Sequence, residues 1–274
     1  MRVFPSRRRA MILVAIVLAL YFAATGALYA LQRRLLFAGA GGPPVSAPVH
    51  GLYRDWLVEV PGGPALHLWR GPAPAKGMPI FVFFHGNGSD TSDFAAFGER
   101  FAARGWGVVL ATYRGYSGNA GAPSEAGLMA DARAILAALD ESDNPLILWG
   151  HSLGSGVAAR MAAEGHGAGL VLEAPYTSIA DVAQRSYPIF PVQLLISDRF
   201  DTMALLPDLK IPVLIFHSAD DRVVPFDMGQ RLATALGTRA TSVFLNDLGH
   251  VPHSAELTPR VAEWLAAQGL LTQR

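Results

Sequence analysis

The chain contains no cysteine, and this absence excludes several kinds of chemistry. Disulfide bridges, thiolate zinc sites and a cysteine nucleophile all require the missing side chain. The eight histidines show no metal-ligand spacing such as that of a His-Glu-x-x-His helix. We therefore expect no metal site in this protein.

Charge is also scarce, because only 16% of the residues are charged and the formal net charge is zero. The first 34 residues hold six arginines and no acidic residue, which leaves 16 basic and 22 acidic side chains in the rest of the chain. Nucleic-acid binding requires a basic surface that so mildly acidic a body does not have. We therefore expect no nucleic-acid partner.

One segment near the N-terminus has no charge at all. The 22 residues from Ala10 to Leu31 would span about 33 Å as a helix, enough to cross the hydrocarbon core of a bilayer. We expect a transmembrane anchor at residues 10–32, after a basic tip at residues 1–9. More arginines precede the segment than follow it, which favours a cytoplasmic N-terminus and a body outside the cytoplasm.

A cleaved signal peptide is the alternative interpretation of this segment, because it ends in small residues around Ala27 and Ala30. Its apolar region is longer than that of a typical signal peptide, which favours the anchor. The residues that follow, 33–50, are rich in glycine and proline and predict a linker. Residues 51–274 then form a single domain of ordinary size.

Strand-like and helix-like patterns alternate along this domain. Helical periodicity predicts one helix that starts near Ser124 and a last helix at residues 255–268. Two runs around Pro-Gly-Gly-Pro predict an antiparallel pair of strands, and further apolar runs too short for helices predict buried parallel strands. These runs are residues 52–60, 65–69, 80–84, 108–112, 146–149, 170–172, 213–216 and 242–245.

This alternation predicts an α/β fold with a mostly parallel sheet and helices on both faces. Residues 176–209 interrupt the rhythm, since they contain prolines and show little periodicity. We expect them to form a cap over the carboxyl edge of the sheet.

A Gly-x-Ser-x-Gly pattern, Gly150-His151-Ser152-Leu153-Gly154, lies between a predicted strand and a predicted helix. So tight a turn forces its serine into a strained backbone conformation, and the two glycines provide the room. The start of the helix directs unpaired N–H groups and a positive dipole end toward the turn. Ser152 is therefore the candidate nucleophile, with an ordinary glycine-rich turn as the alternative.

A serine nucleophile needs a base to take its proton and N–H donors to stabilise the oxyanion. The predicted strand at residues 80–84 runs into His85-Gly86-Asn87-Gly88, a turn that can direct a backbone N–H at the site. We expect the N–H groups of Asn87 and Leu153 to form the oxyanion hole.

These motifs, together with Tyr113-Arg114-Gly115-Tyr116-Ser117-Gly118, resemble the α/β-hydrolase superfamily in their residues and their order. The closest similarity is to its membrane-anchored Bem46-like branch, which residues 32–37 and 121–128 also resemble. The resemblance covers nearly the whole chain. It implies the α/β-hydrolase fold with an eight-stranded sheet and a short cap.

For the acid of a triad, Asp220 and Asp221 both follow the predicted strand at residues 213–216. The family pattern Gly-x-x-Asp-x-x-Val-Pro implies Asp221, four residues before Pro225, and leaves Asp220 as a turn or capping residue. Ser218 occupies the glycine position of this pattern, which puts the geometry of the turn in doubt.

For the base, the resemblance implies His250, which follows a glycine after the last predicted strand. His253 is the alternative, because three residues further along a helical loop it would reach the same region. We expect His85 and His151, which lie inside motif turns, to be structural.

The residues Tyr113, Arg114 and Tyr116 border the expected pocket. We expect them to pack the loop after their strand, with direct contact to substrate as the alternative.

The sequence thus predicts a membrane-anchored serine hydrolase that needs no cofactor. His250, oriented by Asp221, takes the proton of Ser152, and the order of these three residues along the chain matches the order of the fold. The resemblance implies an acyl ester or thioester as substrate, either a small molecule or a lipid. A serine peptidase of the same fold and a non-catalytic, membrane-tethered binding protein are the alternatives.

Overall fold

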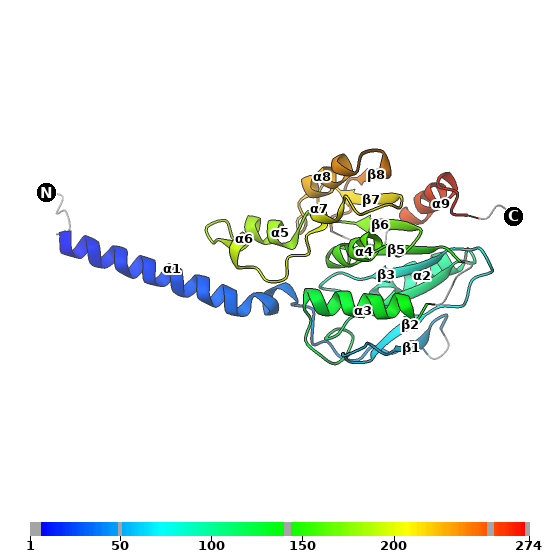
Figure 1. The fold of residues 1–274 in the computed structure, drawn as a ribbon, viewed down its shortest axis with the longest axis horizontal. Helices are drawn as coiled ribbons and strands as arrows, with labels where there is room; N and C mark the ends of the chain where they lie inside the picture. Colours follow the sequence, from blue (N-terminus) through cyan, green and yellow to red (C-terminus); the bar gives the residue numbers. More distant parts are fainter. Residues whose placement is uncertain (1–6, 49–50, 140–143, 251–254, 272–274) are drawn as a thin grey trace.

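A single long helix, α1 (Arg7–Leu36), projects from the rest of the molecule along its longest axis (Figure 1). The computed structural model describes residues 7–48, 51–139, 144–250 and 255–271. None of the residues of α1 is buried, and within the described part of the chain α1 alone is long and apolar enough to cross a membrane.

The body is built on one sheet of eight strands in the order β1-β2-β4-β3-β5-β6-β7-β8. The pairs β1–β2 and β2–β4 are antiparallel, and all other neighbours are parallel. The predicted mostly parallel, eight-stranded α/β-hydrolase sheet is therefore confirmed. The strands are β1 (Arg54–Val58), β2 (Leu66–Arg70), β3 (Ile80–Phe84), β4 (Gly107–Ala111), β5 (Leu146–His151), β6 (Gly169–Glu173), β7 (Val213–Ser218) and β8 (Ala240–Leu245).

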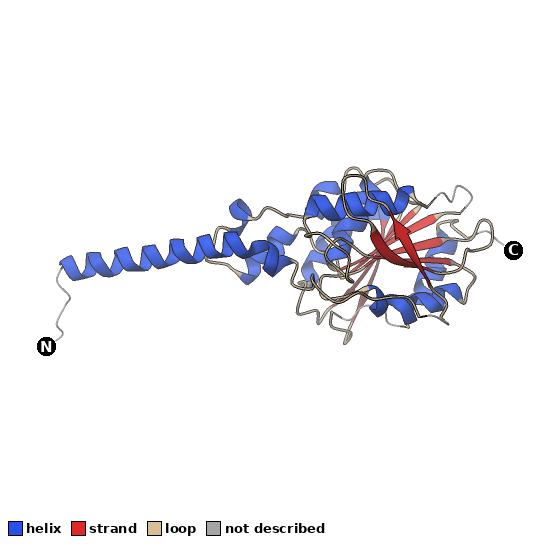
Figure 2. Ribbon diagram, turned by 90° about the horizontal axis from the view of Figure 1, so that it is seen from below, coloured by secondary structure: helices blue, strands red, loops and turns tan. Residues whose placement is uncertain are grey.

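Helices cover both faces of this sheet (Figure 2). One face carries α3 (Glu125–Ala137), α4 (Leu153–Ala163) and α8 (Phe226–Leu236), which share a core cluster. The other face carries α2 (Ala95–Ala102) and α9 (Leu257–Ala267), packed on a second, aromatic-rich cluster. Two short 3-10 helices, η1 (Thr91–Phe94) and η2 (Gly237–Arg239), precede α2 and β8. Ser124 caps α3 through its side chain, as the predicted helix start requires.

The parallel register brings the carboxyl ends of the central strands to one edge. Phe84 of β3 lies opposite Gly150 of β5, and His151 lies opposite Glu173 of β6. In this fold class such an edge is where loops gather to form a site. The loops after β3, β5, β7 and β8 carry the candidate residues.

The cap lies between β6 and β7 and consists of α5 (Ile179–Ser186), α6 (Val192–Leu195) and α7 (Thr202–Leu205). Figure 1 shows α5 and α6 beside the half of α1 that is nearer the body. The ring of Tyr21 stacks on that of Phe190 with centroids 5.6 Å apart, and Arg33 forms an ion pair of 2.8 Å with Asp198. Through these contacts the cap connects α1 to the body.

The segment after α1, for which the sequence predicts a linker, packs on the body. Phe37 is buried in the larger core cluster. The amide of Gly41 donates to the carbonyl of Gly115 at 2.7 Å, and the amide of Ala47 donates to the carboxylate of Asp55 at 3.0 Å. The glycines and prolines of this segment therefore allow its backbone to lie close to the body, although the composition alone suggests a flexible linker.

Candidate active site

Ser152 lies in the turn between β5 and α4, at the centre of the carboxyl edge of the sheet. Its φ of 49° and ψ of −118° lie outside the conformations that a serine ordinarily adopts. Such a strained conformation persists only because the surrounding structure fixes it. The amide of Ser152 donates to the carbonyl of Glu173 at 2.9 Å, which holds the turn against β6.

The two glycines of the motif allow this turn to close. A Cβ on Gly150 would overlap the backbone of Gly154, and a Cβ on Gly154 would overlap the carbonyl of Phe84. Helix α4 therefore starts directly against β3 and β5. Leu153 is its first residue, so its N–H has no partner within the helix and lies beside Ser152.

Three residues far apart in the sequence meet here through their side chains. The Nε2 atom of His250 lies 3.0 Å from the Oγ of Ser152, and its Nδ1 lies 2.8 Å from an oxygen of Asp221. These distances are within the reach required of a nucleophile, its base and the group that orients the base. His253 lies outside the described residues.

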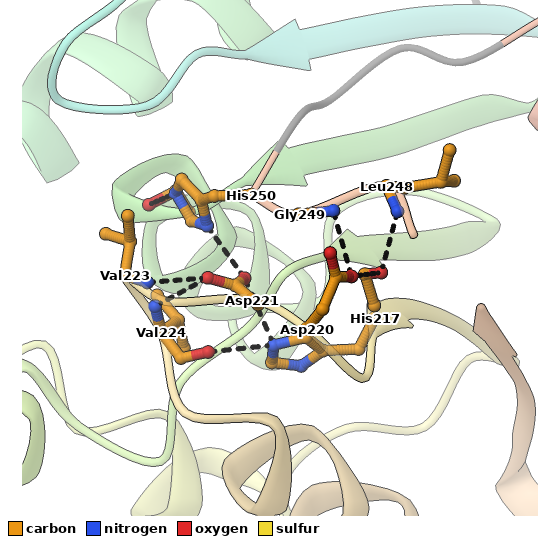
Figure 3. A network of polar contacts seen from close by, with 10 residues as sticks. His217, Asp220, Asp221, Val223, Val224, Leu248, Gly249 and His250 are labelled. Carbon is orange, nitrogen blue, oxygen red and sulfur yellow. Dashed lines mark hydrogen bonds and ion pairs between the residues drawn. The ribbon is translucent and has the colours of Figure 1, made fainter. Parts of the chain in front are cut away.

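The carboxylate of Asp221 is buried and held from several sides (Figure 3). One oxygen accepts the amides of Val223 and Val224 at 2.8 and 2.9 Å, and the other faces His250 and His217. Burial raises the pKa of Asp221, but hydrogen bonds from His217, His250 and Val223 outweigh it and hold this pKa well below its usual range. Asp221 is thus a fixed negative charge behind the imidazole of His250.

The neighbouring carboxylate, Asp220, has a different set of contacts. It accepts the hydroxyl of Ser218 at 2.6 Å and the amide of Gly249 at 3.0 Å (Figure 3). The same hydroxyl accepts the amide of Leu248 at 3.2 Å. Asp220 and Ser218 therefore join the loop after β7 to the loop that carries His250. Among the described residues, no hydrogen bond or ion pair connects Asp220 to the imidazole of His250.

Ser218 occupies a position where the family pattern has glycine, and the structure shows that serine fits the turn there. It is not among the described residues with positive φ, so its backbone conformation is open to any residue. Its hydroxyl is used, because it bonds both Asp220 and Leu248. The departure from the family pattern adds a connection between the two loops and leaves the turn unstrained.

The turn after β3 faces the same edge and is held by aromatic side chains. The hydroxyl of Tyr116 donates to the Oδ1 of Asn87 at 2.7 Å, and that of Tyr113 donates to the carbonyl of His85 at 3.1 Å. Both tyrosines are fully buried and are not among the residues that line the cavity beside Ser152, so they pack the turn. Arg114 is bound to the buried carboxylate of Asp131 at 2.6 Å and is structural as well.

His85 lies beneath this turn as a buried, neutral imidazole. Its ring lies 3.2 Å from the hydroxyl of Thr112 and 2.7 Å from the carbonyl of Gly86. Burial lowers the pKa of His85 from 6.5 to about 4, against smaller opposing effects of the Gly86 carbonyl and nearby carboxylates. His85 is therefore a structural residue, as its position in the motif indicates. His151 is buried too, with its ring centroid 5.1 Å from that of His250.

A cavity of about 280 Å³ begins at Ser152 and runs between the cap and α1. Asn87, Ser152 and Leu153 line its inner end, which places the two candidate oxyanion donors beside the candidate nucleophile. No charged residue is among those that line it in the described part of the chain. No group of three or more described His, Asp or Glu residues could hold a metal ion.

Three contributors to this site could not be identified from the sequence. His217 is the second-last residue of the buried strand β7 and contacts Asp221 at 3.3 Å, whereas side chains in such a strand ordinarily pack in the core. Ser218 departs from the family pattern, which gives no indication that its hydroxyl joins the two loops. The cavity wall formed by α1 faces cap residues that lie more than a hundred positions further along the chain. The only sequence signal for this contact is the low content of charged residues in both segments.

Comparison with known proteins gives a consistent picture. A family model described as serine aminopeptidase, S33, matches residues 76–205. An uncharacterized protein of Mycobacterium tuberculosis is 34% identical over 250 residues, which cover 89% of each chain. The lysophosphatidylserine lipase ABHD12 of Rattus norvegicus is 33% identical over 189 residues, which cover 60% of this chain but only 47% of the lipase. The chain thus matches about half the length of that lipase.

Solved structures share the fold at lower identity. An esterase of Pyrococcus furiosus superposes with a TM-score of 0.66 at 16% identity, over 84% of this chain and 97% of the esterase. An alpha-beta hydrolase of Vibrio vulnificus gives a TM-score of 0.63 at 22% identity, over 80% and 81% of the two chains. At these identities the likeness concerns the fold alone.

Proposed function

This chain belongs to the α/β-hydrolase superfamily, and we propose that it is a membrane-anchored serine hydrolase that cleaves acyl esters or thioesters. The observation that carries the proposal is the relay of contacts from Ser152 to His250 at 3.0 Å and from His250 to Asp221 at 2.8 Å. A binding protein without catalysis would have no use for a strained serine aligned with an imidazole and a buried carboxylate.

In the first step, the Nε2 of His250 takes the proton of Ser152 as Oγ forms a bond to the substrate carbonyl carbon. The oxyanion that results accepts hydrogen bonds from the N–H groups of Leu153 and Asn87. The imidazolium then gives its proton to the leaving alcohol or thiol as the acyl bond breaks. Water, deprotonated by His250, releases the acid and restores Ser152.

The lining of the cavity favours the acyl group as the part of the substrate that binds there. This lining includes leucine, isoleucine and valine side chains and no charged residue among those described. Apolar pockets with few polar groups bind apolar ligand parts, and their polar groups fix orientation. The relative named as a lipase supports esters as the substrate class.

A serine peptidase is the second candidate, because the matching family model is described as a serine aminopeptidase. An aminopeptidase must bind the charged α-amino group of its substrate, and a buried cation needs an anionic partner. The described lining of the cavity offers no carboxylate. This observation favours the ester over the peptide.

Two features of the placement in the membrane belong to the same proposal. We assign residues 10–32 to the bilayer and residues 51–274 to the hydrolase domain. The excess of arginines before the span favours a location of this domain outside the cytoplasm. Since the chain has no cysteine, Leu57→Cys on the exposed surface of β1 would provide a unique label site. A membrane-impermeant maleimide added outside sealed cells should react with it, and reaction only after lysis would reverse the orientation.

Hydrolysis of p-nitrophenyl butyrate, the matching thioester and an amino-acid p-nitroanilide by the full-length protein tests the activity. We expect ester or thioester hydrolysis at rates well above that of the anilide, and a loss of at least about 10³-fold in kcat in Ser152→Ala. Ser155→Ala is the matched control, because Ser155 is buried one turn further along α4 and does not line the cavity. Preferential cleavage of the anilide would favour the peptidase, and equal rates for wild type and Ser152→Ala would refute the serine mechanism.

A further inference from the structure

Helix α1 forms one wall of the cavity that begins at Ser152. The residues that it contributes are spaced along one helical face, at i, i+3, i+4, i+7, i+10 and i+11. They are Thr25, Leu28, Tyr29, Gln32, Leu35 and Leu36. A helix that served only as a tether would have no reason to present one continuous face to the site.

This face is held against the cap by specific contacts. The hydroxyl of Tyr21 donates to the carbonyl of Ile189 at 3.0 Å, and the side chain of Gln32 accepts the amide of Ser197 at 2.7 Å. The hydroxyl of Thr25 donates to the carbonyl of Tyr21 within α1 at 2.8 Å, so its polar group is satisfied by the helix itself. The arrangement leaves an apolar surface toward the cavity.

The contacts fix the depth of the cap relative to the bilayer. Arg33 is the first charged residue after the apolar segment and marks its end on the side of the body. Thr25 lies about 12 Å and Tyr21 about 18 Å further along the helix, at 1.5 Å per residue, whereas the hydrocarbon core is about 30 Å thick. Measured along the helix from Arg33, Thr25 therefore lies in the half of the core nearer the body and Tyr21 lies near its middle. The outer part of the cavity and the tip of the cap are thus at the depth of lipid acyl chains.

The exposed side chains of the cap agree with this depth. Ile189 and Leu194 are 71% and 85% exposed, although both are large and apolar. Beside a transmembrane helix, such side chains face lipid and not water. Figures 1 and 2 both show the cap lying along α1 as it leaves the body.

We propose that α1 is a wall of the acyl pocket as well as an anchor, and that a single-chain acyl lipid enters this pocket sideways from the leaflet that the cap penetrates. The inference rests on the proposed function, since it brings the carbonyl of that lipid to Ser152. The cavity volume of about 280 Å³ lies just below the range for ligand pockets, ~300–1,000 Å³. It fits one acyl chain better than two.

The depth of the cap can be measured without any activity. The chain has no cysteine, so Leu194→Cys carries a single nitroxide label when the full-length protein is placed in phosphatidylcholine vesicles. We expect this label to be more accessible to oxygen than to a polar nickel complex, as in lipid. Leu57→Cys on β1, itself 51% exposed, is the control and should show the opposite preference. A label at residue 194 with the accessibility of the control would overturn the inference.

The role of α1 in substrate selection is tested by filling its cavity face. Leu28→Trp should lower the ratio of kcat/KM for p-nitrophenyl palmitate over butyrate by at least tenfold. Thr25 lies about 4.5 Å further along α1 than Leu28, away from the body. Thr25→Trp should lower kcat/KM for the palmitate ester relative to butyrate while leaving that for the octanoate ester unchanged. Leu31→Trp is the matched control, because Leu31 lies on the same helix, does not line the cavity and is 44% exposed. It should leave both ratios within twofold of wild type.

The two failures are distinguishable. If Leu28→Trp and Leu31→Trp have the same ratios while both proteins hydrolyse butyrate, then α1 does not line the acyl site and the inference is refuted. If the wild type hydrolyses no ester, the proposed function fails and the acyl-pocket inference falls with it, whereas the depth of residue 194 is measured independently. Thermal melting of each variant identifies those that are unfolded, and Leu28→Phe then replaces Leu28→Trp.

Discussion

Gly39 lies so close to the carbonyl oxygen of Asn87 that a Cβ on the glycine would overlap it. The contact joins the segment that follows α1 to the turn whose N–H we assign to the oxyanion hole. The amide of Gly39 also lies 3.3 Å from the Oδ1 of the same asparagine. The position of this turn therefore depends on a residue three positions after the end of α1.

Gly39→Ala should displace the Asn87 backbone and lower kcat by at least tenfold, because an oxyanion donor acts only at the right position. KM for a short ester should change much less. Gly42→Ala is the matched control, since nothing lies within 4 Å of the Cβ it adds and its φ is not in the left-handed region. Steady-state kinetics of the two variants decide this, and equal kcat values would show that the contact has no catalytic consequence.

Asp221→Asn and Asp220→Asn compare two adjacent carboxylates with different partners. Asp221 faces the imidazole of His250, so its amide variant should lose about 10³–10⁴-fold in kcat, as expected when the base loses its orienting anion. Asp220 accepts from Ser218 and Gly249, and its variant retains an oxygen for these bonds. We expect a loss of less than tenfold. A larger loss in Asp220→Asn would reassign the acid.

Ser218→Gly restores the residue that the family pattern carries at this position. It removes the hydroxyl that accepts the Leu248 amide, and a hydrogen bond of this kind contributes about 1 kcal/mol. The His250 loop should become less well positioned, which lowers kcat about three- to tenfold with little change in KM. Ser218→Thr should retain most of the activity. A glycine variant with wild-type kcat would mean that the connection is dispensable.

The sequence could predict most of the fold for a physical reason. Buried parallel strands are short and almost wholly apolar, so each stood out between glycine and proline residues, and the observed strands match the predicted runs closely. Ser152, Asp221 and His250 could be chosen because each lies in a local motif at the end of such a strand. The distances between them depend on the register of the sheet, and only the structure provides it.

What could not be predicted depends on contacts between distant segments. Composition predicts a linker at residues 33–50, but the fit of Phe37 into the core and of Gly39 against Asn87 is a matter of shape. Helix α1 is apolar on all sides within the predicted span. The sequence alone therefore does not distinguish the face that lines the cavity from the faces that would contact lipid.

His85 should make the stability of the protein sensitive to mild acid. Burial lowers its pKa from 6.5 to about 4, so between these values the unfolded chain binds a proton that the folded chain does not. The stability that it contributes is fully present above pH 6.5 and is lost as the pH falls through 4, to a total of about 3 kcal/mol. Urea unfolding of wild type and His85→Gln at pH 7.5 and 5 measures the difference. The variant should lose less stability between the two pH values, and an equal loss would contradict this origin.

The most direct test of the central claim is to locate the adduct of a fluorophosphonate on the full-length protein by peptide mass spectrometry. A serine activated by His250 and Asp221 should carry the adduct at Ser152, and labelling should persist in Ser155→Ala. It should be lost in Ser152→Ala and in His250→Ala. No adduct on the wild type, or an adduct that remains elsewhere in Ser152→Ala, would contradict the assignment of Ser152 as the nucleophile.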